Sequence, residues 1–188
     1  YNTTRRHINV LVNYLYDKDF QVELSRLKTR KQEEVLHRPI KDLKELLLRV
    51  KAYNENLYLC CLFTYGCLLR PHQEIRLLKW SNFSEDISHV NLTGSKVKSK
   101  RNRIVPVPSY LREILVQGEP NHNIFSGSKD SFGKGYFSLL WRRFKTLNPD
   151  VGESVTIYSF RHSGAIEIFN RTGSITKLQK AMGHSSIS

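Results

Sequence analysis

The stretch SHVNLTGSKVKSKRNRIVPVP, residues 88–108, departs from the periodicity of the rest of the chain. Its two ends alternate polar and apolar residues, which is typical of half-buried β-strands. The basic run between them predicts a hairpin tip. Elsewhere apolar residues recur at helical spacing, so we expect a mainly α fold with one small antiparallel β-sheet, an α+β arrangement.

Helical patterns flank this segment on both sides. Before it, residues 42–53, 57–69 and 74–80 are predicted to form helices, the second of them buried on most sides. Pro71 can open the third, and Gly173 fits the C-terminal cap of a later helix. The helices predicted after the strands cover residues 110–116, 131–147, 160–171 and 175–182.

The three cysteines lie in or near the apolar segment LYLCCLFTYGCLL. An odd count without paired spacing argues against a disulfide framework and against a zinc site. Buried, reduced thiols in a cytosolic helix are the expected state. The residues concerned are Cys60, Cys61 and Cys67.

The N-terminal part has a different character. Residues 3–16 alternate at helical spacing and predict a lone helix. The charged run LSRLKTRKQEEVLHRP follows, which is either a linker or a short helix with an arm that lies on DNA. We expect the main domain to begin near Arg38. Because the chain opens without Met, we expect it to be part of something longer.

The charge balance points to a polyanionic partner. The 188 residues include 30 Lys plus Arg against 17 Asp plus Glu, a formal net charge of +13 with a pI near 9.8. DNA and RNA are the partners that such a balance favours. A basic protein with no nucleic-acid role is the alternative. No apolar run is long enough to cross a bilayer.

Arg70 and the hairpin are the first candidates for contacts with an anion. Arg70 follows a buried helix and precedes Pro71; its ordinary interpretation is an Arg favoured by the negative end of the helix dipole. A row of basic side chains in the hairpin suits a phosphate backbone, although a solvated turn would carry the same charges. These side chains are Lys96, Lys98, Lys100, Arg101 and Arg103.

Two further candidates lie near the C-terminus. Arg161 and His162 fall in the first turn of the helix predicted over residues 160–171, where the helix dipole attracts anions. His184 follows Gly183 and can donate a hydrogen bond to a phosphate oxygen. Each of these features taken alone has an ordinary structural explanation, so their order along the chain is what carries weight.

That order resembles the tyrosine recombinases, also called phage-type integrases, which include the Xer and lambda integrase proteins. The motifs are LLRPHQEIRLLKW, KVKSKRNRIVPVP, YSFRH and LQKAMGHSSIS. The resemblance implies the catalytic-domain fold of that family for residues 38–188, without its C-terminal end. It makes residues 1–20 the last helix of a truncated core-binding domain and residues 21–37 a linker.

The resemblance also implies a chemistry. Enzymes of that family attack a DNA phosphodiester with a Tyr hydroxyl, form a 3′-phosphotyrosyl link and need neither ATP nor metal. Arg70 and Arg161 would clamp the non-bridging oxygens, and Lys98, with Lys96 as the alternative, would protonate the leaving oxygen. His184 would support the phosphate. The residues left to bind DNA are Lys96, Lys100, Arg101, Arg103 and His162.

Two positions depart from the family pattern. Tyr158 stands where the family usually has His; its hydroxyl can still donate to a phosphate oxygen, but a phenol is a poor base near neutral pH. Arg70 lies one residue farther from Glu74 than usual. A one-residue insertion, or the turn at Pro71 and His72, must absorb the difference.

The nucleophile is a third departure. In that family the Tyr follows shortly after the Gly-His that is represented here by Gly183 and His184. No Tyr occurs between these residues and Ser188, so we expect the nucleophile beyond Ser188 and expect this fragment to be inactive.

The function expected on this basis is a site-specific DNA recombinase or integrase, acting in integration or excision of a mobile element in the bacterial cytoplasm, at the nucleoid. The alternative is a non-catalytic DNA-binding relative. An RNA-binding protein or a nuclease fits less well; a metal nuclease in particular needs clustered carboxylates, and the acidic residues form no convincing set. We expect double-stranded DNA as partner, a tetramer on paired sites for the full-length protein, a monomer for this fragment, and no cofactor, metal or membrane.

Overall fold

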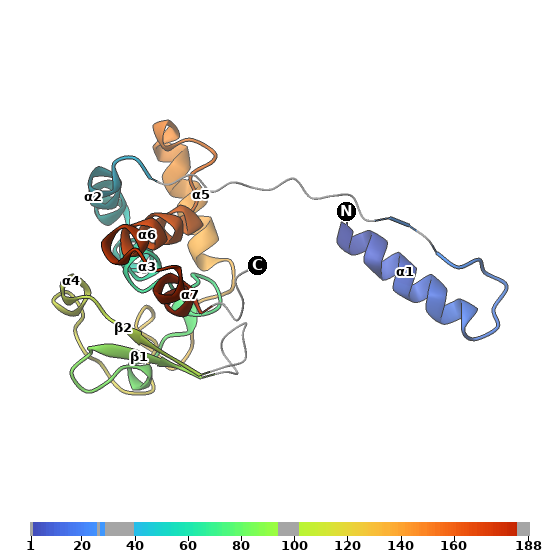
Figure 1. Ribbon diagram of the computed structural model, residues 1–188, viewed down its shortest axis with the longest axis horizontal. Coiled ribbons are helices and arrows are strands. Elements are labelled where there is room, and N and C mark those ends of the chain that lie inside the picture. Colours follow the sequence, from blue (N-terminus) through green and yellow to red (C-terminus); the bar gives the residue numbers. More distant parts are fainter. Residues whose placement is uncertain (1, 26, 29–39, 94–101, 184–188) are drawn as a thin grey trace. The chain divides into compact units, whose positions relative to one another are not determined.

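The computed structural model describes residues 2–25, 27–28, 40–93 and 102–183 (Figure 1). The chain divides into two compact units, Tyr1–Leu36 and His37–Ser188. Among the described residues, each helix is either too short or too polar to cross a membrane.

The first unit contains helix α1 (Asn2–Tyr16), which confirms the helix predicted over residues 3–16. The chain then turns and follows the helix back. The side chain of Asn9 donates to the carbonyl of Leu27 at 3.1 Å, and the amide of Ser25 donates to the side chain of Asn13 at 3.1 Å. Polar contacts therefore tie the returning segment to the helix, which has no buried residue.

The second unit is built around helix α3 (Glu55–Gly66), which is apolar on nearly all sides and is contacted by α2 (Leu43–Tyr53), α5 (Tyr136–Leu147) and α6 (Ile157–Thr172) (Figure 1). Asparagine at position 54 caps α3, since the Asn54 side chain accepts from the amide of Leu57 at 2.9 Å. The expected burial is confirmed, and the three cysteines are buried and free.

Helix α3 ends three residues earlier than predicted. Leu68 has a φ of 51°, in the left-handed region, so the chain cannot continue as a helix to residue 69. Leu68 and Leu69 are nevertheless fully buried. The apolar run therefore continues the core after the helix has stopped.

The predicted sheet is confirmed. Strands β1 (His89–Leu92) and β2 (Arg103–Pro106) pair antiparallel, with Val90 opposite Val105 and Leu92 opposite Arg103. Val90, Leu92 and Val105 face the core and are at most 4% exposed. The chain is thus mainly helical with a two-stranded sheet, as the change of periodicity indicated.

The helix predicted over residues 74–80 is wrong in extent. Only a 3₁₀ helix, η1 (Ile75–Leu77), forms there. Immediately after it the main chain pairs with a distant segment: Leu78 accepts from the amide of Ile124 at 3.1 Å, and Trp80 donates to the carbonyl of His122 at 3.1 Å. These tertiary hydrogen bonds replace those that a longer helix would make.

Two other helices are shorter than predicted. The segment 110–116 forms only α4 (Ser109–Arg112), and the segment 131–147 becomes helical from Tyr136 onward. The second start is late because Gly133 and Gly135 lie among the first five residues of the predicted helix, and glycine disfavours helix formation.

Helix α6 begins three residues earlier than predicted, at Ile157. The Ser159 hydroxyl accepts a hydrogen bond from the main-chain amide of Thr156 at 3.0 Å and fixes this start. Arg161 therefore lies in the second turn, and its expected place in the first turn is wrong. Gly173, with a φ of 60°, ends the helix as predicted, and α7 (Ile175–Met182) follows.

Helices α3 and α6 approach very closely. A Cβ atom added at Gly164 on α6 would come 2.1 Å from the main-chain oxygen of Tyr65 on α3. Only glycine permits this contact, which sets how far the polar residues of α6 stand from those that follow α3.

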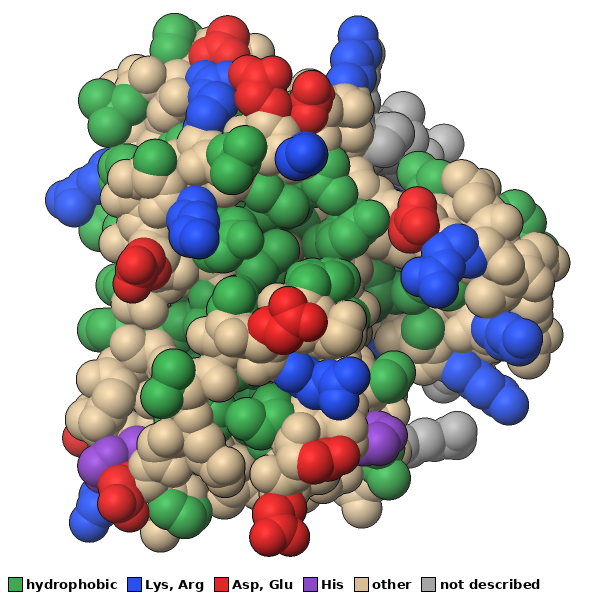
Figure 2. Space-filling model, turned by 90° about the vertical axis from the view of Figure 1, so that its left-hand side faces the viewer, with side chains coloured by type: hydrophobic (Ala, Val, Ile, Leu, Met, Phe, Trp, Pro, Cys, Tyr) green, Lys and Arg blue, Asp and Glu red, His purple; other side chains and the backbone are tan. Residues whose placement is uncertain are grey.

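The outer surface shown in Figure 2 carries charges of both signs. Hydrophobic side chains gather in a hollow near the middle of this face, and Lys and Arg side chains are interspersed with Asp and Glu around it. The net charge of +13 is therefore not displayed as a patch of one sign on this face.

Candidate oxyanion-binding site

A buried carboxylate lies at the centre of the candidate site. The Glu74 side chain has no exposed surface. It accepts hydrogen bonds from Nη1 of Arg70 and from the main-chain amide of Arg70, both at 2.8 Å, and from Nη2 of Arg103 at 3.2 Å. A buried charge is tolerable only when it is paired in this way.

The turn between Arg70 and Glu74 combines hydrogen bonds of two spacings. The carbonyl of Arg70 accepts from the amide of Ile75 at 3.0 Å, and the carbonyl of Pro71 accepts from the amide of Arg76 at 3.0 Å. These two hydrogen bonds span one residue more than an α-helical bond does, whereas the amide of Glu74 donates to the same Arg70 carbonyl at 2.9 Å with α-helical spacing. Arg70 reaches Glu74 across this turn, and the extra residue expected between them stays a prediction.

Arg161 enters the same region from α6. It is 4% exposed, and its Nη2 donates to the main-chain oxygen of Met182 at 2.7 Å. Its Nη1 is buried without a hydrogen-bond partner among the described residues. Arg161 therefore holds a buried donor that nothing in the described chain satisfies.

The pKa of Arg161 reflects these surroundings. Burial, together with the charges of Arg70 and Arg103, lowers the pKa of Arg161 to about 10, although Glu74 and Tyr158 act in the opposite direction. The guanidinium remains charged at neutral pH but lacks a full complement of negative charge. An anion placed beside it would relieve this deficit.

Arg103 joins the cluster from the first position of β2. Its side chain is 12% exposed, and its Nε is also buried without a partner in the described part of the chain. Burial lowers its pKa, Glu74 raises it and Arg70 lowers it. A Cβ atom added at Gly183 would come 2.1 Å from its Nη1, so Arg103 lies directly against that glycine.

Three guanidinium groups thus surround one carboxylate, and two of them have a buried N–H without a partner among the described residues. The cluster is positively charged overall. Guanidinium groups form paired, charge-assisted hydrogen bonds with phosphate and carboxylate oxygens. The arrangement is suited to bind an oxyanion, whereas no group of three His, Cys, Asp or Glu residues in the described chain can hold a metal ion.

Arg76 provides a contrast. It is also buried, but its Nε donates to the carbonyl of His72 at 3.1 Å and its Nη1 donates to the hydroxyl of Ser131 at 3.0 Å. Its donors are used within the protein, so it is a structural residue. Burial alone therefore does not distinguish the arginines of the candidate site.

The structure brings the predicted pair Arg70 and Arg161 into one cluster. Tyr158 is half-buried in the first turn of α6, and its influence on the pKa of Arg161 places it beside the cluster. His162 is exposed. The remaining predicted residues lie outside the described residues: Lys96, Lys98, Lys100, Arg101 and His184.

Two members of the cluster were missed or misplaced by sequence reasoning. Glu74 received no role, although a carboxylate four residues after Arg70 and beside the apolar Ile75 is a signal of a buried ion pair. Arg103 was grouped with the exposed hairpin. Its position opposite the core residue Leu92 is the signal that it points to the protein interior.

The fold and the cluster together define a mainly helical domain with a candidate oxyanion-binding site beside a small hairpin. Residues 29–188 match the Phage integrase family, and the chain belongs to that family.

Individual proteins are also similar to this chain. The chain is 28% identical over 134 residues to the tyrosine recombinase XerC of Rhizobium meliloti, covering 66% of this chain and 40% of that protein. It is 24% identical over 197 residues to XerA of Thermococcus kodakarensis, covering 98% of this chain and 69% of that protein. A crystal structure of the XerH site-specific recombinase matches the fold with a TM-score of 0.64 at 14% identity, over 99% of this chain and 59% of that one.

Proposed function

We propose that this chain is the catalytic part of a site-specific DNA recombinase and that its arginine cluster binds the phosphate at which the strand is cut. The observation that carries the proposal is the pair of buried, unpartnered N–H groups on Arg103 and Arg161, in a described cluster whose one carboxylate cannot balance its charge. The matching XerH structure is that of a site-specific recombinase bound to palindromic difH substrate in a post-cleavage complex, which supports a recombination-site substrate here.

The reaction would proceed by transfer of a phosphodiester bond. A Tyr hydroxyl from beyond Ser188 would attack phosphorus, so that the new bond is Tyr O–P and the bond that breaks joins phosphorus to the 5′-oxygen. Lys98, or alternatively Lys96, would protonate that oxygen as it leaves. The reverse step with another 5′-hydroxyl would rejoin the strands.

The cluster would act on the charge that builds up on the non-bridging oxygens. Arg70 is held by Glu74 and Arg161 by Met182, so both guanidinium groups are oriented before substrate binds. Removing one preorganised donor of this kind costs about 10²–10³ in rate. Tyr158 and His184 would add hydrogen bonds to the same phosphate.

Double-stranded DNA would be held mainly by contacts to its backbone. Affinity would then fall steeply with salt, because each phosphate contact releases counterions. The basic residues proposed for these contacts are Lys96, Lys100, Arg101 and His162. We further propose a tetramer on paired DNA sites for the full-length protein, a role with a mobile element in the bacterial cytoplasm, and no activity for the chain without its nucleophile.

The test is a covalent adduct. The full-length gene product is incubated with a nicked DNA that carries its attachment site, and the products are separated on a denaturing gel. We expect an adduct that maps to a Tyr beyond Ser188, is lost with Arg161→Ala and is retained with Arg171→Ala, an exposed arginine on the same helix.

A different outcome would favour the alternative. Tight, salt-sensitive DNA binding without any adduct would identify a non-catalytic DNA-binding relative. An adduct that survives Arg161→Ala would contradict the role given to the cluster.

A further inference from the structure

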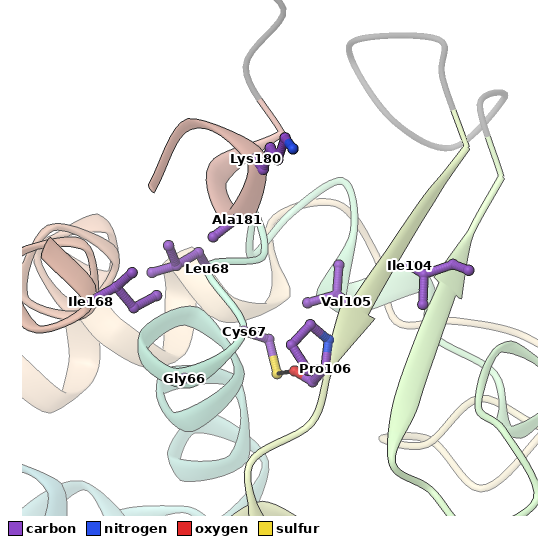
Figure 3. A pocket seen from close by; sticks show the side chains of 9 residues that line it. All are labelled: Gly66, Cys67, Leu68, Ile104, Val105, Pro106, Ile168, Lys180 and Ala181. Atoms are coloured by element: carbon purple, nitrogen blue, oxygen red, sulfur yellow. Dashed lines mark hydrogen bonds between the residues drawn. The ribbon is translucent and has the colours of Figure 1, made fainter. Parts of the chain in front are cut away.

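Helix α7 lies at the surface of the domain. It has no fully buried residue, and Leu178, Ala181 and Met182 are half-buried. A cavity of about 60 Å³ lies between it and its neighbours, lined by Lys180 and Ala181 of α7, by residues 66–68 at the end of α3 and by residues 104–106 of β2 (Figure 3). The cavity leaves this side of the helix incompletely packed.

One hydrogen bond and one close packing contact hold the C-terminal end of α7. The main-chain oxygen of Met182, the last residue of the helix, accepts from Nη2 of Arg161 at 2.7 Å. Gly183, which follows it, lies directly against Nη1 of Arg103. Two arginines from different elements, α6 and β2, thus meet the same end of one helix.

Arg103 makes a second contact that links this end to the other side of the site. Its Nη2 donates to Oε2 of Glu74 at 3.2 Å, and Oε1 of Glu74 accepts from Nη1 of Arg70 at 2.8 Å. The contacts therefore run without interruption from Arg70 through Glu74 and Arg103 to the end of α7, and from there to Arg161.

We infer that Arg103 is a positioning residue that holds the C-terminal end of α7 against Glu74 and so fixes Arg70 and Arg161 relative to each other. The consequence for catalysis rests on the proposed function; the consequence for α7 does not.

The shape of arginine suits this position. Nη2 of Arg103 donates to Glu74 while Nη1 packs against Gly183, because the guanidinium nitrogens lie in one fixed plane. A lysine carries a single ammonium at the end of a flexible chain and cannot hold both contacts at once. Gly183 completes the fit, since any Cβ at this position would collide with the guanidinium.

The first test is hydrogen–deuterium exchange of this chain, without DNA. With Arg103→Gln we expect amide exchange in residues 175–182 to accelerate by roughly tenfold or more, while α3 keeps its protection. The exchange rate of α7 with Arg103→Lys should lie between the rates of Arg103→Gln and of the parent chain. Arg112→Gln, which changes an exposed arginine on α4, should exchange at the same rate as the parent chain. Unchanged exchange in α7 with Arg103→Gln would overturn the inference.

A double-substitution cycle gives a second test. Gly183→Ala should lower the melting temperature less in an Arg103→Ala background than in the parent chain, because the atoms that the new methyl group meets are then absent. Equal decreases in both backgrounds would contradict the contact. This cycle still tests the contact between Arg103 and Gly183 if Arg103→Gln lowers stability too far for exchange measurements.

The third readout is cleavage by the full-length protein. Arg103→Lys should lower the single-turnover cleavage rate by roughly tenfold or more, while the Kd for DNA changes little. A proportional loss of affinity would assign Arg103 a DNA-binding role alone and overturn the inference. If the unsubstituted protein forms no adduct, the proposed function fails, and the exchange experiment still tests Arg103.

Discussion

Arg161 donates a hydrogen bond of 2.7 Å to the main-chain oxygen of Met182, so the second turn of α6 holds the last residue of α7. The same guanidinium keeps Nη1 buried and without a partner in the described chain. One edge of the side chain is therefore structural, and the other is available to a ligand. This division connects the stability of the C-terminal helix to the chemistry of the site.

The buried carboxylate is the first point at which the site can be tested. Glu74→Gln keeps the shape of the side chain but leaves three guanidinium groups without a counter-charge. We expect the free energy of unfolding to fall by about 3 kcal/mol, as for other buried ion pairs that lose one partner. Urea denaturation measures this change. The exposed Glu113→Gln should have almost no effect, and equal losses for both variants would contradict the account.

The close approach of α3 and α6 predicts a steric effect. Gly164→Ala places a methyl group 2.1 Å from the main-chain oxygen of Tyr65, which cannot move independently of α3. We expect destabilisation of about 3 kcal/mol, at the upper end for an overpacked core. Gly135→Ala is the matched control, because a Cβ there meets nothing within 4 Å and its φ of −86° suits any residue. Thermal unfolding that ranks the two variants equally would refute the contact.

The positive cluster predicts stabilisation by tetrahedral anions. Because the pKa of Arg161 is lowered in the folded chain, its charged form opposes folding at pH values below about 10, and this cost disappears as the pH rises above that value. A bound phosphate ion would relieve the same cost at pH 7. We expect phosphate, compared with chloride at equal ionic strength, to raise the melting temperature by about 2–4 °C.

Arg161→Ala is the informative variant in that experiment. It should abolish the difference between phosphate and chloride, whereas the exposed Arg171→Ala should retain it. A phosphate effect that is the same in all three proteins would show that the anion acts elsewhere on the surface.

The cysteines predict the chemical reactivity of the folded chain. Burial raises the pKa of all three thiols, that of Cys67 to about 12, so thiolate is scarce at pH 8. We expect no labelling by a thiol reagent in the native state and labelling of all three thiols in denaturant. Rapid labelling of any one of them under native conditions would contradict the packing around α3.

The sequence predicted the helices whose ends are set by local chemistry. Helix α7 matches its predicted bounds because Ser174 accepts from the amide of Lys177 at one end and Gly183 adopts a φ of 67° at the other. The helix predicted over residues 74–80 does not form because hydrogen bonds with residues 122 and 124 compete with helix formation there. Such long-range pairing leaves no periodic trace in the sequence.

Part of the candidate site was likewise predictable from the sequence, and part depended on long-range contacts. The pairing of Arg70 with Arg161 came from the order of motifs, and the structure brings both to Glu74. The place of Arg103 depends on the register of a two-stranded sheet, which the sequence does not specify to one residue. The contact of Arg103 with Gly183 joins two elements that are far apart in the chain, so it could be found only from the three-dimensional structure.

The central claim is that the cluster acts on the negative charge of the cut phosphate. It is tested most directly by single-turnover cleavage, by the full-length protein, of DNA in which a methyl group replaces one non-bridging oxygen of that phosphate and removes its charge. On normal DNA we expect Arg161→Ala to lower the rate by about 10²–10³. On the neutral linkage the variant should come within a few-fold of the unsubstituted protein. An equal loss on both substrates would contradict the claim.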